Sequence, residues 1–129
     1  MTTVTTMAAN NMTGMIEVGG EGGGDAARDQ LGTLLLGGEA VHFATGGEKG
    51  AALFTDRRIL IASEAGVFTK RSVVTMVRRA AIDAVTIDSS DKLTVQCSGR
   101  GFGSFYLSFD GATAPEGLAR WFAEGMAGA

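Results

Sequence analysis

The sequence has little of several residues on which chemistry or covalent stability often depends. Its 129 residues include one cysteine, one histidine and one proline. Cys97 has no second thiol for an intramolecular disulfide and no neighbours at zinc-binding spacing. The sequence therefore predicts a protein with no cofactor, either metal or redox.

Long hydrophobic runs are also absent. The longest apolar stretches fall well short of the roughly 20 residues that a membrane-spanning helix needs. Residues 1–15 have neither the basic start nor the apolar core of a secretory signal. These absences predict a soluble, cytoplasmic protein.

Glycine, in contrast, is abundant. Twenty glycines argue against a helical bundle, because each glycine costs a helix about 1 kcal/mol relative to alanine. A hydrophobic content of 45% in a chain of this length suffices for one domain with a single core.

Charge is unevenly distributed along the chain. Residues 49–79 hold seven basic and two acidic residues, a net charge of +5, whereas the remainder holds four basic and twelve acidic residues, a net charge of −8. A basic segment of this kind can form a surface patch, while the acidic remainder repels general polyanions. We expect no nucleic-acid binding.

Residues 1–25 differ in composition from the rest and end in a glycine-rich stretch. We expect a flexible or partner-docking tail and linker there, followed by one domain over residues 26–129. Some apolar residues of the tail recur at nearly helical spacing and would suit an apolar groove. They are Val4, Met7, Met12, Met15 and Ile16.

From Asp25, capping and apolar spacing predict a short helix that includes Ala27, Leu31, Leu34 and Leu35 and stops at Gly37 and Gly38. Strands follow, separated by turn residues. Their expected ranges are 39–44, 51–55, 57–63, 72–78, 82–88, 92–98 and 104–109.

The last two strands alternate apolar and polar residues, as half-buried strands do. Thr113 and Glu116 then have capping-box spacing around Pro115, and a final helix follows. Its apolar stripe is made of Leu118, Trp121, Phe122 and Met126. The fold class is therefore mainly β with a terminal helix.

The strand at 57–63 is apolar on both faces, so it is either sandwiched within the domain or lies at an interface between molecules. In the second case Ile59, Leu60 and Ile61 would mediate self-association.

Four segments in order, LLLGGEAVHF, ALFTDRRILI, GVFTKRS and IDAVTI, resemble bacterial pleckstrin-homology-like domains. The resemblance spans about residues 31–126 and departs from the family pattern at 76–81, where VRRAA replaces a common Pro-Tyr step. It implies a barrel of about seven antiparallel strands closed by the C-terminal helix. It also implies binding and oligomerisation, in some members as rings, instead of catalysis.

Phosphoinositide recognition is not implied. In the eukaryotic domains the lipid headgroup sits at a basic loop between the first two strands, and the matching loop here, TGGEKG, carries only Lys49.

The paired arginines of the Thr55–Arg58 segment have two interpretations. They stabilise a turn, with Asp56 accepting from nearby backbone amides and Arg57 or Arg58 reaching a carbonyl or carboxylate on a neighbouring strand. Alternatively, the basic residues of adjacent strands form a surface for an anion or a partner, although strand parity splits each doublet between two faces. That surface would consist of Arg57, Arg58, Lys70, Arg71, Arg78 and Arg79.

No segment carries a catalytic signature. His42 lacks a recognisable acid-base partner, and the glycines of SGRGFGS lie between two strands and suit a hairpin turn better than a phosphate loop. Cys97 shares a strand face with Leu93 and Val95, where a buried thiol is unreactive. We expect no enzyme and no small-molecule substrate.

Two functions remain. The first is a protein-interaction and self-assembly module that forms a homo-oligomer, with an unidentified protein partner also open. The second is peripheral binding of an anionic membrane surface through residues 49–79, where each basic residue contributes about 1 kcal/mol.

Overall fold

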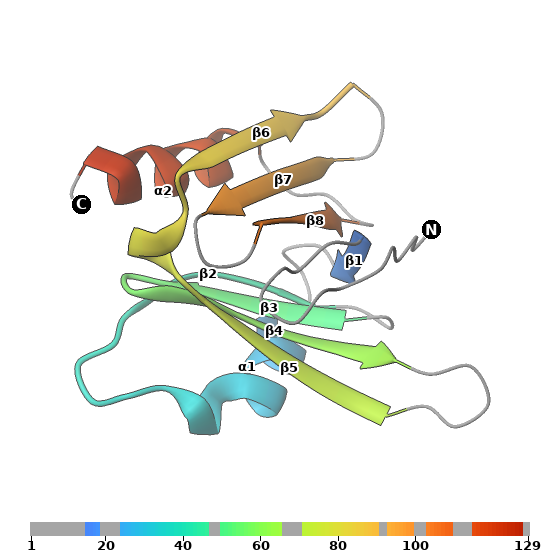
Figure 1. Cartoon of the computed structure of the whole chain (residues 1–129). Coiled ribbons are helices and arrows are strands. Elements are labelled where there is room, and N and C mark those ends of the chain that lie inside the picture. Colours follow the sequence, from blue (N-terminus) through green and yellow to red (C-terminus); the bar gives the residue numbers. More distant parts are fainter. Residues whose placement is uncertain are drawn as a thin grey trace.

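In the computed structural model, the described residues form two four-stranded sheets and two helices (Figure 1). The structure describes residues 15–18, 24–46, 50–65, 71–90, 93–99, 103–109 and 115–127. The strands are β1 (Met15–Val18), β2 (Val41–Gly46), β3 (Gly50–Thr55), β4 (Arg58–Ala65), β5 (Arg71–Arg78), β6 (Ala84–Asp88), β7 (Thr94–Gly99) and β8 (Gly103–Phe109). The helices are α1 (Gly24–Leu31) and α2 (Pro115–Ala127), with 3-10 turns η2 (Gly32–Leu34) and η3 (Arg79–Ala81).

Both sheets are built from antiparallel neighbours. One has the order β2-β3-β4-β5 and the other β1-β8-β7-β6. The exception is β1, which pairs parallel with β8, with Met15 opposite Tyr106 and Val18 opposite Phe109. The prediction of a mainly β domain with a terminal helix is confirmed.

The expected closed barrel is wrong in one respect. Among the described strands no pairing joins the two sheets, because the chain leaves β5 through η3 and enters β6 in the other layer. The sheets face each other across a common core, so this is an open sandwich (Figure 1).

Strand β1 lies in the segment for which we predicted a tail. Its pairing with β8 makes residues 15–18 part of the sheet. The other predicted tail residues up to 23 lie outside the described part of the chain. The division of the chain at residue 25 stays a prediction.

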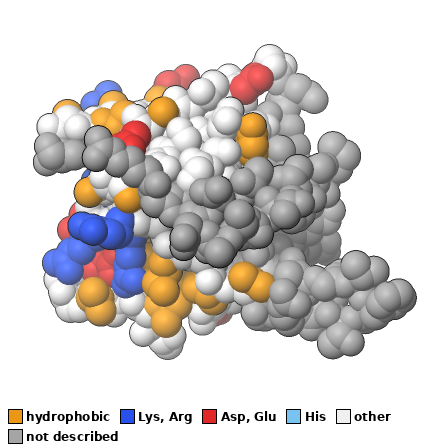
Figure 2. All heavy atoms as spheres, in the orientation of Figure 1, with side chains coloured by type: hydrophobic (Ala, Val, Ile, Leu, Met, Phe, Trp, Pro, Cys, Tyr) orange, Lys and Arg blue, Asp and Glu red, His pale blue; other side chains and the backbone are white. Residues whose placement is uncertain are grey.

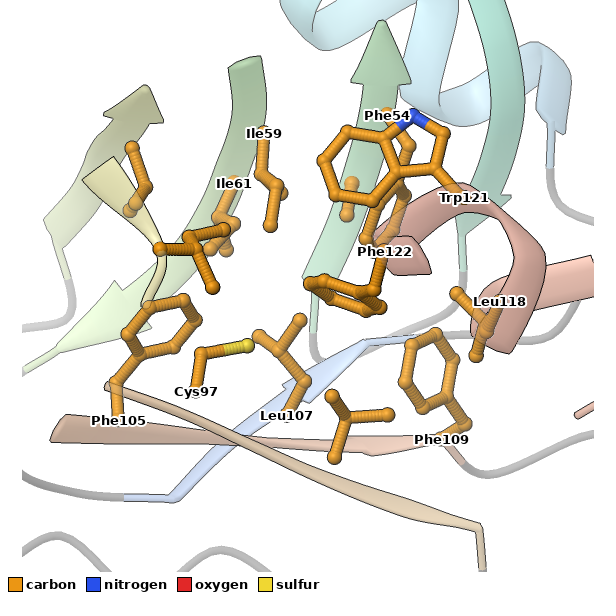
Figure 3. Packing of buried hydrophobic residues seen from close by; sticks show 14 of the residues in the cluster. Phe54, Ile59, Ile61, Cys97, Phe105, Leu107, Phe109, Leu118, Trp121 and Phe122 are labelled. Atoms are coloured by element: carbon orange, nitrogen blue, oxygen red, sulfur yellow. The ribbon is translucent and has the colours of Figure 1, made fainter. Parts of the chain in front are cut away.

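The main core fills the space between the sheets. Alternate residues of β7 and β8 point into it, as the sequence pattern predicted, and α2 adds its apolar stripe (Figure 3). Its largest members include Phe54, Ile59, Ile61, Phe105, Leu107, Phe109, Leu118, Trp121 and Phe122. The ring of Trp121 meets Phe54 edge-on, with centroids 5.2 Å apart. Helix α2 therefore packs into the sandwich by three residues of its predicted stripe, whereas the fourth, Met126, is 38% exposed.

A second, smaller cluster lies on the outer face of the β2-β3-β4-β5 sheet, under α1. It consists of Ala27, Leu31, Ala51, Leu53, Leu60 and Ala62. The helix ends at Leu31, earlier than predicted, and Leu34 is 37% exposed instead of sharing the buried face. Gly38, with φ of 81°, completes the turn before β2 in a conformation that side chains other than glycine rarely adopt.

Both faces of β4 are thus covered within one molecule. Ile59 and Ile61 belong to the main core and Leu60 to the cluster under α1, and all three have no exposed surface. The sandwiched interpretation of this strand is confirmed. The self-association role predicted for Ile59, Leu60 and Ile61 does not fit their burial, because no part of them is accessible to a second molecule.

Candidate interaction surface

A buried ion pair anchors the segment before β2 to the start of β4. The Arg58 guanidinium binds the Glu39 carboxylate through two bonds of 2.9 Å, from Nε to Oε2 and from Nη2 to Oε1. Arg58 also donates to the backbone oxygen of Leu34 (2.6 Å) and to the sulfur of Met76 (3.1 Å). The Glu39 side chain has no exposed surface and that of Arg58 is 18% exposed. Such two-point contacts fix geometry as well as charge.

The hydroxyl of Thr55 extends this network into the turn between β3 and β4. It donates to Glu39 Oε2 (2.7 Å) and accepts from the backbone N–H groups of Arg57 (3.1 Å) and Arg58 (3.0 Å). The bond from Arg58, with those from the Leu36 N–H and Thr55, outweighs burial and lowers the pKa of Glu39 to about 2. Glu39 is therefore a structural carboxylate, ionised at neutral pH.

The turn-stabilising interpretation of Thr55–Arg58 is borne out by these contacts. Asp56 Oδ1 accepts from the backbone N–H of Ala40 (3.1 Å), and Arg58 reaches a carboxylate and a carbonyl. The partners of Asp56 and Arg58, Ala40 and Glu39, lie in the segment before β2 and not on a neighbouring strand. These contacts therefore tie the turn to a part of the chain that is distant in sequence.

Arg79 is held by α2. Its guanidinium carbon lies 4.4 Å from the centroid of the Trp121 ring, and Nη2 donates to the backbone oxygen of Trp121. The indole Nε1–H of Trp121 in turn donates to the backbone oxygen of Thr55 (2.9 Å). The interaction of a cation with the face of tryptophan is the most favourable of its kind. Arg79 thus joins η3 to α2.

Four of the six predicted basic residues lie together in the described part of the chain. Arg58 and Arg78 are opposite each other, and Arg57 and Arg79 share a backbone hydrogen bond of 2.8 Å, so these four gather at one end of the β4-β5 pair. Arg71 is opposite Ala65 at the other end of that pair. Seven residues separate it from Arg78, which at the rise per residue of a strand is a distance of about 20 Å. Lys70 lies outside the described residues.

Within the group of four, two side chains are exposed. Arg57 and Arg78 face solvent, whereas Arg58 and Arg79 are engaged by Glu39 and Trp121. Figure 2 shows basic side chains gathered with acidic ones at the lower left of the molecule, and hydrophobic side chains beside them.

The hydrophobic strip comes from the outer face of β5. Val74 is 46% and Met76 53% exposed, opposite the buried Ala62 and Leu60 of β4. Helix α1 packs mainly against β2, β3 and β4. Within the described residues β5 pairs with β4 alone, so its other edge offers unpaired backbone groups beside exposed apolar side chains.

The residues considered for chemistry lie elsewhere. His42 is exposed on β2, and burial raises the pKa of the Cys97 thiol to about 12. Among the described residues no cluster of three or more histidine, cysteine or acidic side chains is placed to hold a metal ion. The described helices include none with the length and apolar character to span a bilayer.

The arrangement of sheets and terminal helix is similar to that of a known protein. The crystal structure of a DUF1696 family protein with a pleckstrin-homology domain, from Shewanella loihica PV-4, superimposes with a TM-score of 0.65 at 17% sequence identity. The similarity covers 78% of this chain and 91% of that one. This chain has a pleckstrin-homology-like fold. The resemblance expected from the four sequence segments is confirmed at the level of the PH-like fold.

The sequence matches no family model and no curated protein. At 17% identity the likeness of the PH-like domain to its structural neighbour concerns the fold alone.

Proposed function

We propose that this PH-like domain is a non-enzymatic protein-interaction and self-assembly module that forms a homo-oligomer, a closed ring being one form. The observation that carries the proposal is the outer face of β5. There, exposed Val74 and Met76 run along a strand whose second edge has no partner among the described residues.

The combination of edge and apolar strip favours a protein partner. An unpaired strand edge supplies backbone donors and acceptors in a fixed repeat, and natural proteins usually protect such edges with charge, bulges or a covering element. Here α1 covers the apolar faces of β3 and β4 and leaves that of β5 open. A second copy that pairs with β5 satisfies the backbone groups and buries both side chains.

Self-association is proposed through β5 in place of β4. The burial of Ile59, Leu60 and Ile61 within one molecule leaves Val74 and Met76 as exposed large hydrophobic residues of the same sheet.

Light scattering on the purified full chain at micromolar concentration tests the proposal. We expect a mass several times that of one chain, reduced towards the monomer by Val74→Lys or Met76→Lys, because a buried ammonium group at the contact is unfavourable. Met126→Lys is the matched control, since Met126 is 38% exposed on α2. A wild-type monomer, or equal effects of all three variants, contradicts the proposal.

A second candidate, binding of an anionic membrane surface, is favoured by the exposure of Arg57 and Arg78 at the same end of the domain. We rank it second because Arg58 and Arg79 are engaged within the chain. Sedimentation with phosphatidylserine vesicles checks it. Binding that is abolished by salt and by joint Arg57→Glu and Arg78→Glu substitution supports the membrane role, and binding indifferent to both refutes it.

A further inference from the structure

Two segments that are distant in sequence supply most of the exposed apolar side chains of the described residues. One is β5 and the other is the stretch between α1 and β2. Four of the five exposed large hydrophobic residues belong to them, namely Leu34, Leu36, Val74 and Met76. The fifth, Met126, is on α2.

The buried ion pair of Glu39 and Arg58 joins these two segments. Arg58 Nη2 donates to the backbone oxygen of Leu34 (2.6 Å), and Arg58 Nη1 donates to the sulfur of Met76 (3.1 Å). Glu39 Oε1 accepts from the backbone N–H of Leu36 (3.0 Å) and from Arg58 Nη2 (2.9 Å). One charged pair therefore holds three of the four exposed apolar residues around it.

Two exposed arginines border these apolar residues. Arg78 is opposite Arg58 in the β4-β5 pairing, so its side chain points to the same face of the sheet as that of Met76, two residues earlier. The Arg57 guanidinium lies beside the turn before β2, where a β-carbon on Gly38 would be 3.7 Å from Nη2. Neither the Arg57 nor the Arg78 guanidinium has a hydrogen-bond or ion-pair partner among the described residues.

We infer that this apolar-basic patch binds a short segment of another protein that carries both apolar and acidic side chains. The patch consists of Leu34, Leu36, Val74, Met76, Arg57 and Arg78. The inference rests on the protein-interaction part of the proposed function and names the chemistry of the partner.

Each part of the patch has a role in this binding. The apolar side chains of the segment cover the exposed leucine and methionine residues, and its carboxylates bind the two arginines, whose forked donors suit two-point contacts. Because the Glu39–Arg58 pair already holds the apolar residues in place, little conformational freedom is lost on this side of the contact.

The distribution of charge favours such a segment over an anionic membrane. Recognition of a charged leaflet commonly uses clusters of about four to eight basic residues. This patch offers two exposed arginines, and the chain outside residues 49–79 carries a net charge of −8, which a uniformly anionic surface repels. A segment whose carboxylates face only Arg57 and Arg78 avoids that repulsion.

Two occupants from the same chain match the patch in part. Residues 1–14 include apolar side chains but no Asp or Glu, so they supply no carboxylate to the arginines. A second copy is the partner in the self-assembly proposed above, which uses Val74 and Met76. A bound segment that covers these two residues therefore competes with a second copy.

Selection of peptides tests the inference. The probe is a phage-displayed library of random peptides of about twelve residues, selected on the immobilised full chain. We expect the enriched peptides to combine apolar residues with two or more Asp or Glu. Synthetic copies of them are then titrated with the full chain and followed by fluorescence anisotropy.

Substitutions inside and outside the patch separate this site from general attraction. We expect Leu36→Ser and Arg78→Glu each to weaken peptide binding at least tenfold. Met126→Ser and Arg120→Glu, which change exposed residues of α2 in the same way, are expected to alter it less than twofold. Failure to enrich peptides, enrichment of peptides without acidic residues, or equal losses in patch and control variants would overturn the inference.

The other occupants give different results. Binding to phosphatidylserine vesicles that is lost in Leu36→Ser, without enrichment of peptides, would assign the patch to a membrane and overturn the inference. Peptide binding that becomes tenfold tighter on removal of residues 1–14 would assign it to that segment and overturn it too. Light scattering keeps the proposed self-assembly separate: a wild-type monomer that binds the peptides ends self-assembly and supports this inference, whereas an oligomer that binds none does the reverse.

Discussion

The guanidinium carbon of Arg79 lies 4.4 Å from the centroid of the Trp121 ring, which places a cation from η3 on the face of the aromatic residue that plugs the sandwich. Gly125, one helical turn beyond Trp121, makes room for the Arg79 side chain. A β-carbon added at Gly125 would lie 2.8 Å from Arg79 Cγ, closer than real contacts of this kind allow. The contact between η3 and α2 therefore depends on a glycine in the helix.

We predict that Gly125→Ala destabilises the domain by about 1–3 kcal/mol, because Arg79 must leave its place on α2. The control is Gly117→Ala in the same helix, where the added carbon meets nothing within 4 Å. That substitution is expected to stabilise by up to about 1 kcal/mol through helix propensity. Urea unfolding followed by Trp121 fluorescence gives both values. Equal stability of the two variants would show that Arg79 does not need the space.

The ion pair of Glu39 with Arg58 leads to a second prediction. Glu39→Gln retains the shape of the side chain but removes the charge that Arg58 requires, so we expect a loss of about 1–3 kcal/mol in the free energy of unfolding. Glu124→Gln changes an exposed carboxylate of α2 and is expected to cost less than about 0.5 kcal/mol. If Glu39→Gln is no worse than Glu124→Gln in urea unfolding at pH 7, the pair does not stabilise the fold.

The same pair makes stability depend on pH in a defined direction. The folded pKa of Glu39, about 2, lies below its ordinary value of 4.5, so the folded state favours the ionised form. The resulting stabilisation is complete above pH 4.5 and is lost as the pH falls towards 2. We expect the stability difference between wild type and Glu39→Gln to shrink between pH 5 and pH 2 in urea unfolding. A constant difference over that range would contradict the assigned pKa.

Asp88 also has a lowered pKa, because its carboxylate accepts hydrogen bonds from the backbone N–H and hydroxyl of Ser90. Asp88 is present in both the wild type and Glu39→Gln, so its titration cancels in the difference between their free energies of unfolding. The pH dependence of that difference therefore reports on Glu39.

Local patterns predicted much of this fold. The alternation in residues 92–109 gave the correct inward residues of β7 and β8, and the stripe of Leu118, Trp121 and Phe122 gave the buried face of α2. Ser108 is the exception in the last strand: it was expected to face away from the core but is buried, and β1 lies beside it with Glu17 opposite.

Contacts between distant segments could not be predicted in the same way. The sequence indicated that an arginine of the 55–58 turn needs an acceptor, but Glu39 was assigned to a strand and its pairing with Arg58 depends on how the chain folds. Arg79 likewise finds Trp121 across 42 positions. The exposure of Val74 and Met76 depends on which other segments pack over the outer face of the sheet, and the sequence of β5 alone does not show this.

Strand β1 is the element whose type the sequence pattern missed, since Met15 and Ile16 were read at helical spacing. Its backbone pairs with β8 over residues 15–18, opposite a stretch that includes the buried Leu107 and Phe109 of the main core. A parallel strand at this edge protects the β8 backbone from solvent and from other chains.

Removal of residues 1–18, which include β1, is therefore expected to lower the free energy of unfolding by about 1–2 kcal/mol through lost backbone hydrogen bonds. Removal of residues 1–14 keeps β1 and is the matched control, expected to unfold at the wild-type urea concentration. If the longer deletion also leaves the urea midpoint unchanged, β1 contributes nothing to stability and the tail predicted for residues 1–25 extends through it.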